Sequence, residues 1–408
     1  MSTTGLSIRR CALISRAAMV LLLLGGLGAC AGGQQHAEAS GAQGATSGNA
    51  TDARPATNPE PEADYWVYVG AESADKLHRV RFGPDGIEVE RTTNIGRLPT
   101  EVEGPHGLVV SPDRRYLYMT TGHGVPDGHF WKFEIGPDSL VAEPILLDRF
   151  PATLDVTPDG LYAFVVNFNL HGAMVPSTMS VVYTPDVVEV DQIELCTMPH
   201  GVRTHRSGSF VYSVCMMDDQ LVEVDTRSFQ VSRRFSVDLE GPGAIAEPVA
   251  MAEHDHGAHH DTTCSPTWAL PSPDGSEIFV ACNAADEILQ IDHESWELAR
   301  RFDTGRGPYN LEMTSDGRLL IATLKQGDAV EFFDLATGES LARTPTSTRV
   351  VHGVTVSPDD RFAFVSVEGI GAEPGKVDVF DLTTFELVAS AEVGQQAAGI
   401  DFYRMQAR

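Results

Sequence analysis

The sequence predicts an all-β fold made of seven similar units, and three observations carry this prediction. A short motif of the Pro-His-Gly type recurs along the chain. Each copy is followed by short apolar runs of strand length with turn signals between them. The last copy is incomplete, and the N-terminal part of the chain can supply its missing strands. Repeats of this period with several short strands are typical of β-propeller blades.

The motif opens each unit at the start of an apolar run. The spacings between its central residues are 46, 48, 67, 42, 43 and 46 positions. Five residues later most copies reach a turn, such as TPDG at 157–160 or SPDG at 272–275. An aromatic and β-branched run follows the turn, and in several copies a third run ends in Asp. The central residues, in chain order, are His106, Ala152, His200, Thr267, Tyr309, His352 and Ala398.

The two ends of the repeat region predict how the fold is closed. Only ten residues follow Ala398, which is enough for one strand of a blade. Residues 66–71 match the pattern of a second strand, and residues 77–82 can form a third. We therefore expect a single seven-bladed β-propeller over residues 64–408, closed by joining the N-terminal and C-terminal strands. Such closure leaves few exposed strand edges.

The second runs of the units, such as YLYMTT and LYAFVVN, resemble the Tyr-Val-Thr-Asn pattern of bacterial YVTN-type, surface-layer-associated seven-bladed propellers. The ring as a whole is similar to the propeller of nitrous oxide reductase, and the resemblance covers roughly residues 64–408. In the reductase family, histidines on one propeller face hold a copper cluster. This chain departs from that pattern, because four of the seven motif positions are not His and no segment resembles the reductase's separate copper domain. Propellers serve many tasks, so function has to be argued from the site.

The first 29 residues are predicted to be a bacterial lipoprotein signal peptide. Arg9, Arg10 and Arg16 precede an apolar core at 17–24, and the exit Leu-Gly-Ala-Cys resembles a lipobox in which Cys30 becomes lipidated. The alternative is an ordinary cleaved signal. Residues 30–63, rich in Gly, Ala, Ser, Gln and Pro, form a flexible linker in this interpretation. We expect an exported protein that is lipid-anchored in the cell envelope, at the outer membrane facing the periplasm or the cell surface.

Charge and motif content exclude several function classes. The formal charge is −28, from 29 basic and 57 acidic residues, so we expect no nucleic-acid partner. The chain contains no CxxCH haem motif and no phosphate loop, so neither haem nor a nucleotide is expected. We expect a monomeric ring that meets the membrane through its lipid only.

Propeller topology gathers the histidines on one face. The first strand of each blade lines the central channel, and its starting end shares a face with the loop between the second and third strands. His205 falls about 16 Å from His200, at the far end of the same strand. Ten of the 14 histidines map to the motif face: His106, His123, His129, His171, His200, His254, His256, His259, His260 and His352. Four of these belong to a His-rich insertion at 240–263, between two blades.

Clustered imidazoles bind transition metals, and we consider copper first. Met216 and Met217 lie on the same face, and their thioethers would favour Cu(I) if they act as ligands. Tyr309 and Asn310 are candidate ligand-binding residues at the channel mouth. The alternatives are histidines that hydrogen-bond within their own blades, an insertion that is a solvated acidic loop, and methionines that only pack.

Four cysteines follow the predicted lipidation site, Cys30. Cys215 and Cys282 each lie 15 residues after a motif centre, and Cys196 and Cys264 precede theirs by four and three. A hairpin centred on the turn would bring these positions together, so we predict disulfides Cys196–Cys215 and Cys264–Cys282, each joining the first two strands of one blade. The alternative is a thiolate metal ligand from Cys215 or Cys282.

The leading hypothesis is a lipid-anchored envelope propeller that binds a small ligand or a transition metal at its histidine-bearing mouth. The second hypothesis is a scaffold that binds an envelope protein. The third is an enzyme, either a lactonase-like hydrolase or an oxidoreductase. No Gly-x-Ser-x-Gly or His-Glu-x-x-His motif supports the third hypothesis, so the sequence names no catalytic residue.

Overall fold

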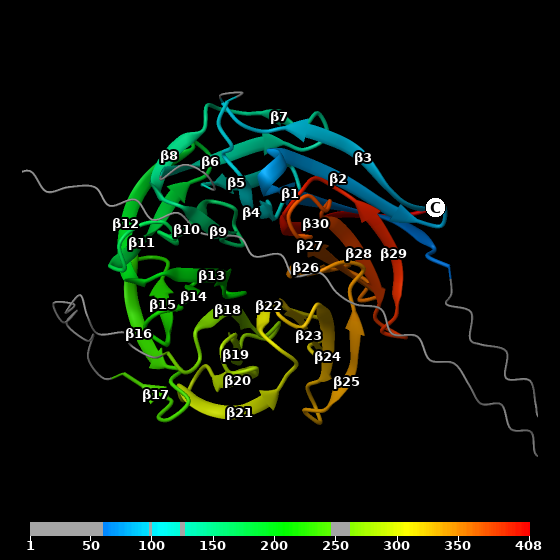
Figure 1. Ribbon diagram of the computed structural model, residues 1–408. Coiled ribbons are helices and arrows are strands. Elements are labelled where there is room, and N and C mark those ends of the chain that lie inside the picture. Colours follow the sequence, from blue (N-terminus) through cyan, green and yellow to red (C-terminus); the bar gives the residue numbers. More distant parts are fainter. Residues whose placement is uncertain (1–59, 98–99, 123–126, 246–261) are drawn as a thin grey trace, which may run out of the picture. The chain divides into compact units, whose positions relative to one another are not determined.

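The computed structural model describes residues 60–408, except 98–99, 123–126 and 246–261 (Figure 1). Within them, seven antiparallel sheets follow one another around a ring, which confirms the predicted seven-bladed propeller. The signal peptide, Cys30, most of the linker, His123, His254, His256, His259 and His260 lie outside the described residues. No helix in the described part of the chain is long and apolar enough to span a membrane.

Blade 1 closes the ring by combining both ends of the described chain. Its strands are β1 (Ala63–Ala71), β2 (Lys76–Gly83), β3 (Gly86–Asn94) and β30 (Ala397–Ala407), with a short 3-10 helix, η1 (Glu72–Ala74), between β1 and β2. β30 is the innermost strand and pairs with β1 from Ala63↔Ala407 to Ala71↔Ala397. The predicted closure is confirmed, and it removes the two sheet edges that an open ring would expose.

The other six blades follow in chain order, each starting with its innermost strand. Blade 2 comprises β4 (Pro105–Val110), β5 (Tyr116–Thr121), β6 (Asp127–Glu134), β7 (Ser139–Leu140) and β8 (Ile145–Arg149). Blade 3 comprises β9 (Pro151–Val156), β10 (Tyr162–Asn167), β11 (Pro176–Tyr183) and β12 (Val188–Thr197). Blade 4 comprises β13 (Pro199–Thr204), β14 (Phe210–Cys215), β15 (Gln220–Asp225), β16 (Gln230–Ser236) and β17 (Gly243–Ala244).

The last three blades are four-stranded. Blade 5 comprises β18 (Pro266–Pro271), β19 (Glu277–Cys282), β20 (Glu287–Asp292) and β21 (Glu297–Asp303). Blade 6 comprises β22 (Pro308–Met313), β23 (Leu319–Leu324), β24 (Ala329–Asp334) and β25 (Ser340–Pro345). Blade 7 comprises β26 (Val351–Val356), β27 (Phe362–Val367), β28 (Lys376–Asp381) and β29 (Leu387–Glu392).

The turn signals of the sequence form a repeated hydrogen-bonded unit between the first two strands. In blade 3, the Thr157 hydroxyl donates to the Asp159 carboxylate, which also accepts the Leu161 backbone N–H. The same pattern recurs at Ser111, Ser272, Thr314 and Ser357. Short Asp and Ser side chains that bond their own backbone favour such turns, which fixes the register of each hairpin.

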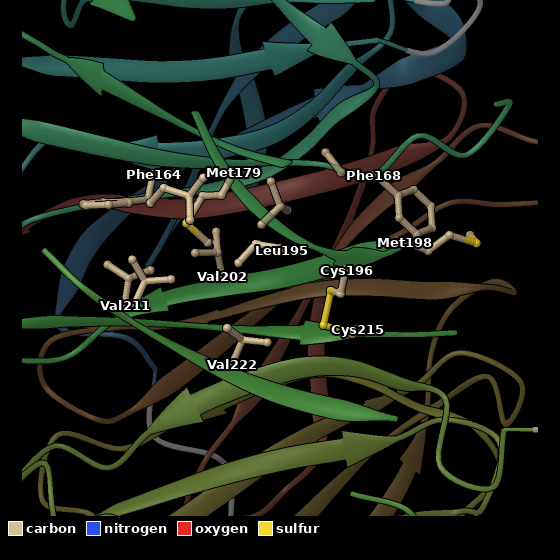
Figure 2. Packing of buried hydrophobic residues seen from close by; sticks show 14 of the residues in the cluster. Phe164, Phe168, Met179, Leu195, Cys196, Met198, Val202, Val211, Cys215 and Val222 are labelled. Carbon is tan, nitrogen blue, oxygen red and sulfur yellow. A yellow bond between two sulfur atoms is a disulfide. The ribbon is translucent and has the colours of Figure 1, made fainter. Parts of the chain in front are cut away.

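The hydrophobic core lies between neighbouring blades. Between blades 3 and 4, Phe164 and Met179 pack against Val202, Val211 and Val222, and all five are buried (Figure 2). Alternating residues of each strand supply these contacts, because successive side chains of a strand point to opposite faces. The core therefore holds the blades together face to face and leaves the innermost strands around a central channel.

Both predicted disulfides are present. Figure 2 shows Cys196 bonded to Cys215, and Cys264 is bonded to Cys282. The predicted placement within one blade is wrong for the first pair, because Cys196 lies on β12 of blade 3 and Cys215 on β14 of blade 4. Cys196 sits at the end of the outermost strand, just before the chain returns to the channel, so the bond joins two blades. Cys264 lies in the connection that leads into blade 5.

Candidate metal and ligand site at the channel mouth

Each motif residue is the second residue of an innermost strand, as in β4, β13, β22 and β26. In all seven blades the pairing of the innermost strand with the second strand shifts register close to this residue. Such irregularities bend a strand and re-aim a side chain. The repeat therefore presents its motif side chains together at one mouth of the channel.

Two groups of possible metal-ligand side chains converge among the described residues: Glu72, His106 and His352, and Asp218 with the two cysteines of the Cys196–Cys215 disulfide. The disulfide sulfur atoms are not thiolates, so the first group is the candidate. Each of its residues offers one ligand atom, and the three atoms lie within 4.8 Å of one another. The Glu72 Oε1 atom is 2.5 Å from the His106 Nδ1 atom, and the rings of His106 and His352 are 5.3 Å apart. All three side chains are buried, with exposed fractions of 1%, 7% and 3%.

His200 has a different role at the same mouth. Its Nδ1 atom is 2.7 Å from the Thr267 carbonyl oxygen, which can only accept, so Nδ1 carries the proton. Its Nε2 atom is 3.1 Å from the Tyr309 hydroxyl. Burial lowers the pKa of His200 to about 3, so this imidazole is neutral at physiological pH. His200 thus bonds to blades 5 and 6 and lies outside the group of three.

Tyr309 connects two of the histidines. Its hydroxyl is also 3.3 Å from the His352 Nε2 atom. Burial raises the pKa of Tyr309, so the phenol stays protonated. Lys325 lies against the same ring, with Nζ 4.1 Å from the ring centroid and 2.7 Å from the Glu368 Oε1 atom.

A cavity of about 230 Å³ opens above the histidines. Phe150, Phe168, Leu170 and Met216, from blades 3 and 4 and the connection before blade 3, form its apolar side. Its polar side holds Lys325 and Glu368 beside Tyr309, His352 and Glu72, from blades 6, 7 and 1. A mixed lining of this kind is typical of small-molecule sites.

Sequence reasoning did not select Glu72, Lys325 or Glu368. Each directly follows the second strand of its blade, namely β1, β23 or β27. The rule that loops between second and third strands share the motif face also applies to these positions. Glutamate and lysine are common on any protein surface, so, unlike the clustered His, Cys and Met side chains, these charged residues gave no distinctive signal in the sequence.

The remaining described candidates lie apart from this group. His129 is 3.0 Å from an Arg97 nitrogen, and burial lowers its pKa. His171 lines a separate cavity of about 240 Å³, and Phe150 contacts both His171 and His106. Met216 and Met217 both pack against the core between blades 3 and 4, and Met216 also lines the channel cavity.

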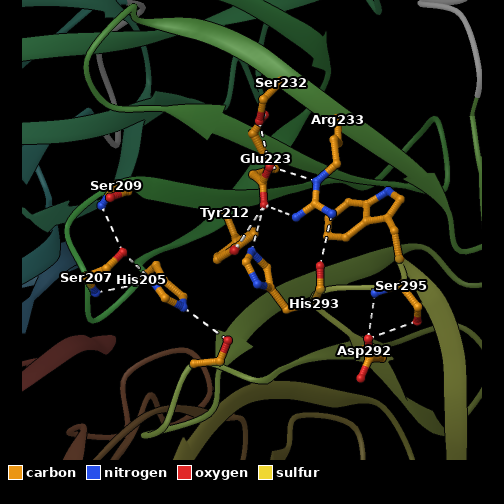
Figure 3. A network of polar contacts seen from close by, with 12 residues as sticks. His205, Ser207, Ser209, Tyr212, Glu223, Ser232, Arg233, Asp292, His293 and Ser295 are labelled. Atoms are coloured by element: carbon orange, nitrogen blue, oxygen red, sulfur yellow. Dashed lines mark hydrogen bonds and ion pairs between the residues drawn. The ribbon is translucent and has the colours of Figure 1, made fainter.

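One further candidate, Asn310, and the histidine excluded by the repeat register, His205, lie away from the mouth. Asn310 lines a smaller space of about 30 Å³ on the inner side of His106 and His352. His205 is at the opposite end of β13, as expected, where its ring takes the place of the turn hydroxyl. Figure 3 shows His205 bonded to Ser207, near the Glu223 and Arg233 pair. The Nε2 atom of His205 is also 3.1 Å from the Gly275 carbonyl oxygen.

Three residues beyond the motif centre, four of the seven innermost strands carry a charged residue. These residues are Asp155, Arg203, Glu312 and Asp401, on β9, β13, β22 and β30. The Asp155 carboxylate accepts the Thr204 N–H, so it links blade 3 to blade 4. Burial raises the pKa of Glu312 to about 7 and that of Asp401 to about 6, against the effect of the Arg203 charge.

Solved structures with the same architecture are available for comparison. The periplasmic gluconolactonase PpgL of Pseudomonas aeruginosa is 17% identical with a TM-score of 0.63, covering 84% of this chain and 99% of its own. A functionally unknown protein from Desulfotomaculum acetoxidans is 14% identical with a TM-score of 0.60, covering 83% and 98%. Hydrazine synthase of Kuenenia stuttgartiensis is 17% identical with a TM-score of 0.56, covering 74% and 90%.

No protein-family model matches the chain, and no curated protein sequence matches it. At these identities, the structural similarity shows the fold alone. The comparisons therefore support the seven-bladed β-propeller fold, and the function has to be argued from the channel mouth.

Proposed function

We propose that the channel mouth binds one divalent transition metal ion, copper first, through Glu72, His106 and His352. The observation that carries this proposal is the convergence of their three ligand atoms within 4.8 Å. Ligands at about 2.0–2.1 Å from a tetrahedral ion lie about 3.3 Å apart, so a small contraction would suffice. Imidazole suits Cu, Zn and Ni, and the affinity order of divalent ions places Cu(II) first.

The surroundings of the group support a metal site. Glu72 either ligates the ion directly or holds the Nδ1–H of His106 so that Nε2 faces the ion. Carboxylate partners of metal-binding histidines commonly act in the second way. The Tyr309 hydroxyl beside His352 provides a polar neighbour that is close enough to orient this ring.

The compartment follows from separate evidence. Disulfides persist in oxidising compartments, so the bonds Cys196–Cys215 and Cys264–Cys282 indicate an extracytoplasmic protein. We propose, in addition, that Cys30 carries the lipid that anchors the protein in the envelope. Mass spectrometry of the protein isolated from membranes would test this, and an unmodified or absent Cys30 would contradict it.

Metal analysis of protein purified without an affinity tag tests the metal site. The His-rich insertion could bind metal independently, so the background protein carries His254→Asn, His256→Asn, His259→Asn and His260→Asn. We expect about one equivalent of Cu(II) or Zn(II) after dialysis, with nitrogen couplings from two imidazoles in the electron paramagnetic resonance spectrum of the copper form.

His106→Ala and His352→Ala should each remove this equivalent. His205→Ala, at the opposite end of β13, is the matched control and should retain it. Less than a tenth of an equivalent in the background protein, or a stoichiometry unchanged by both channel substitutions, would overturn the proposal.

A further inference from the structure

We propose that the same cavity binds a small organic monocarboxylate, held between the metal ion and the ammonium group of Lys325. This inference rests on the proposed metal site and names the ligand class that the site would accept. The carboxylate would complete the coordination of the ion, and its hydrocarbon part would face Phe168 and Met216. No covalent step is involved.

The charge balance of the cavity is the first argument. Glu72 and Glu368 contribute two negative charges and Lys325 one positive charge, so the lining carries −1 with neutral imidazoles. Metal ligation requires neutral His, so a divalent ion changes this sum from −1 to +1. A monoanion then brings the cavity to neutrality. The cavity should therefore repel carboxylates without the metal and attract them with it.

The position of Lys325 is the second argument. Its Nζ atom is 2.7 Å from Glu368 Oε1 and lies over the Tyr309 ring, which fixes the ammonium group at the cavity wall. An ammonium group has three N–H donors, so the bond to Glu368 leaves capacity for a second acceptor. Burial opposes the charged form, but the charge and hydrogen bond of the Glu368 carboxylate raise the pKa of Lys325, so the positive charge persists.

The shape of the cavity is the third argument. Its apolar residues come from blade 3, blade 4 and the connection before blade 3, whereas Lys325 and Glu368 come from blades 6 and 7. A ligand with one charged end and one short hydrocarbon end matches this division. The volume of about 230 Å³ lies below the 300–1,000 Å³ typical of drug-sized ligands. A free small molecule fits, and a folded partner does not.

Other ligand classes fit less well. A cation would add to a lining that the metal has made positive. A dianion such as phosphate would leave an excess negative charge in a partly buried space. A neutral molecule would make no use of the Lys325 charge. Propionate is therefore the probe of choice, with propylammonium and inorganic phosphate as probes of charge.

Calorimetric titration of propionate into the Zn(II)-loaded and the metal-free protein tests the inference, in the background without the insertion histidines. We expect propionate to bind the Zn(II) form at least about tenfold more tightly than the metal-free form. Lys325→Gln should weaken this binding about tenfold, the loss expected for one hydrogen bond to a charged group. The bound zinc, measured in parallel, should stay unchanged in Lys325→Gln. Lys376→Gln, at the start of β28 and outside the cavity, is the matched control.

The outcomes separate the two proposals. One equivalent of zinc with propionate affinity that does not depend on the metal, or that Lys325→Gln leaves intact, overturns the carboxylate site and leaves the metal site standing. Tighter binding of phosphate or propylammonium than of propionate by the Zn(II) form overturns the ligand class. Absence of metal binding overturns both proposals.

Discussion

The Glu72 carboxylate of blade 1, the blade that closes the ring, meets the His106 imidazole of blade 2, with Oε1 2.5 Å from Nδ1. Glu72 follows β1, which pairs with the C-terminal strand β30 in blade 1, and His106 lies on β4 of blade 2. The third member of the group, His352, comes from blade 7. The candidate site is therefore assembled from the blades on both sides of the closure, and closing the ring is a condition for forming it.

Substitution Glu72→Gln should lower metal affinity at the channel mouth about 10–100-fold, whether the carboxylate ligates the ion or orients His106. The ring should stay folded, because Gln retains the size and a hydrogen-bonding oxygen. Competition with a chelator of known affinity measures the effect. Glu294→Gln, exposed in a turn of blade 5, is the control and should bind as the unmodified protein does. Equal affinity of the two variants would exclude a role for Glu72.

Substitution Gly399→Ala should destabilise the closure. A Cβ atom at Gly399 would overlap the carbonyl oxygen of His106 on the neighbouring innermost strand, so β30 and β4 would have to separate. Overpacking of this kind costs about 1–3 kcal/mol or more. Gly241→Ala is the control, because a Cβ there meets nothing within 4 Å. Urea unfolding of both variants measures the difference, and equal stabilities would contradict the tight approach of the two strands.

Removing the disulfide between blades 3 and 4, by Cys196→Ala with Cys215→Ala, should lower the free energy of unfolding by about 2–4 kcal/mol. The two cysteines are 19 residues apart, and the bond limits the freedom of this loop in the unfolded chain. Denaturant titration under oxidising conditions is the measurement. Reductant should destabilise the variant further through Cys264–Cys282. A variant as stable as the oxidised parent would show that the core alone holds these blades.

Glu312 should make stability depend on pH. Burial raises its pKa from 4.5 to about 7, so the folded protein holds the proton more tightly than the unfolded chain does. The resulting stabilisation is complete below about pH 4.5 and is lost as the pH rises through 7.

The comparison with Glu312→Gln isolates this group. The free energy of unfolding of the parent protein, relative to Glu312→Gln, should fall by about 1–3 kcal/mol between pH 4.5 and 8. The exposed Glu339→Gln is the control and should show no such trend. A difference between parent and Glu312→Gln that stays constant over this range would contradict a buried, proton-binding Glu312.

The repeat pattern was sufficient to predict most of the fold. Motif centres such as His106 and Tyr309 occupy equivalent places on the innermost strands, and the ten residues after Ala398 do complete blade 1. These features follow from local rules, because turn residues and alternating strands recur with each blade. Both cysteine pairings were also predictable. The blade to which Cys196 belongs was not, because only one residue separates the outermost strand of blade 3 from the first strand of blade 4.

The sequence by itself determined the number of blades, the closure and the position of each motif residue on an innermost strand. Only the tertiary structure decided that His106 and His352 converge with Glu72, whereas His200 bonds to Thr267 and Tyr309. The position of a residue within its repeat predicts where it lies along its strand and on which face of the ring it emerges. The distances between side chains of different blades depend on how those blades pack, which no periodic pattern records. The ion pair of Lys325 and Glu368 likewise joins two blades, so its formation depends on how blades 6 and 7 pack.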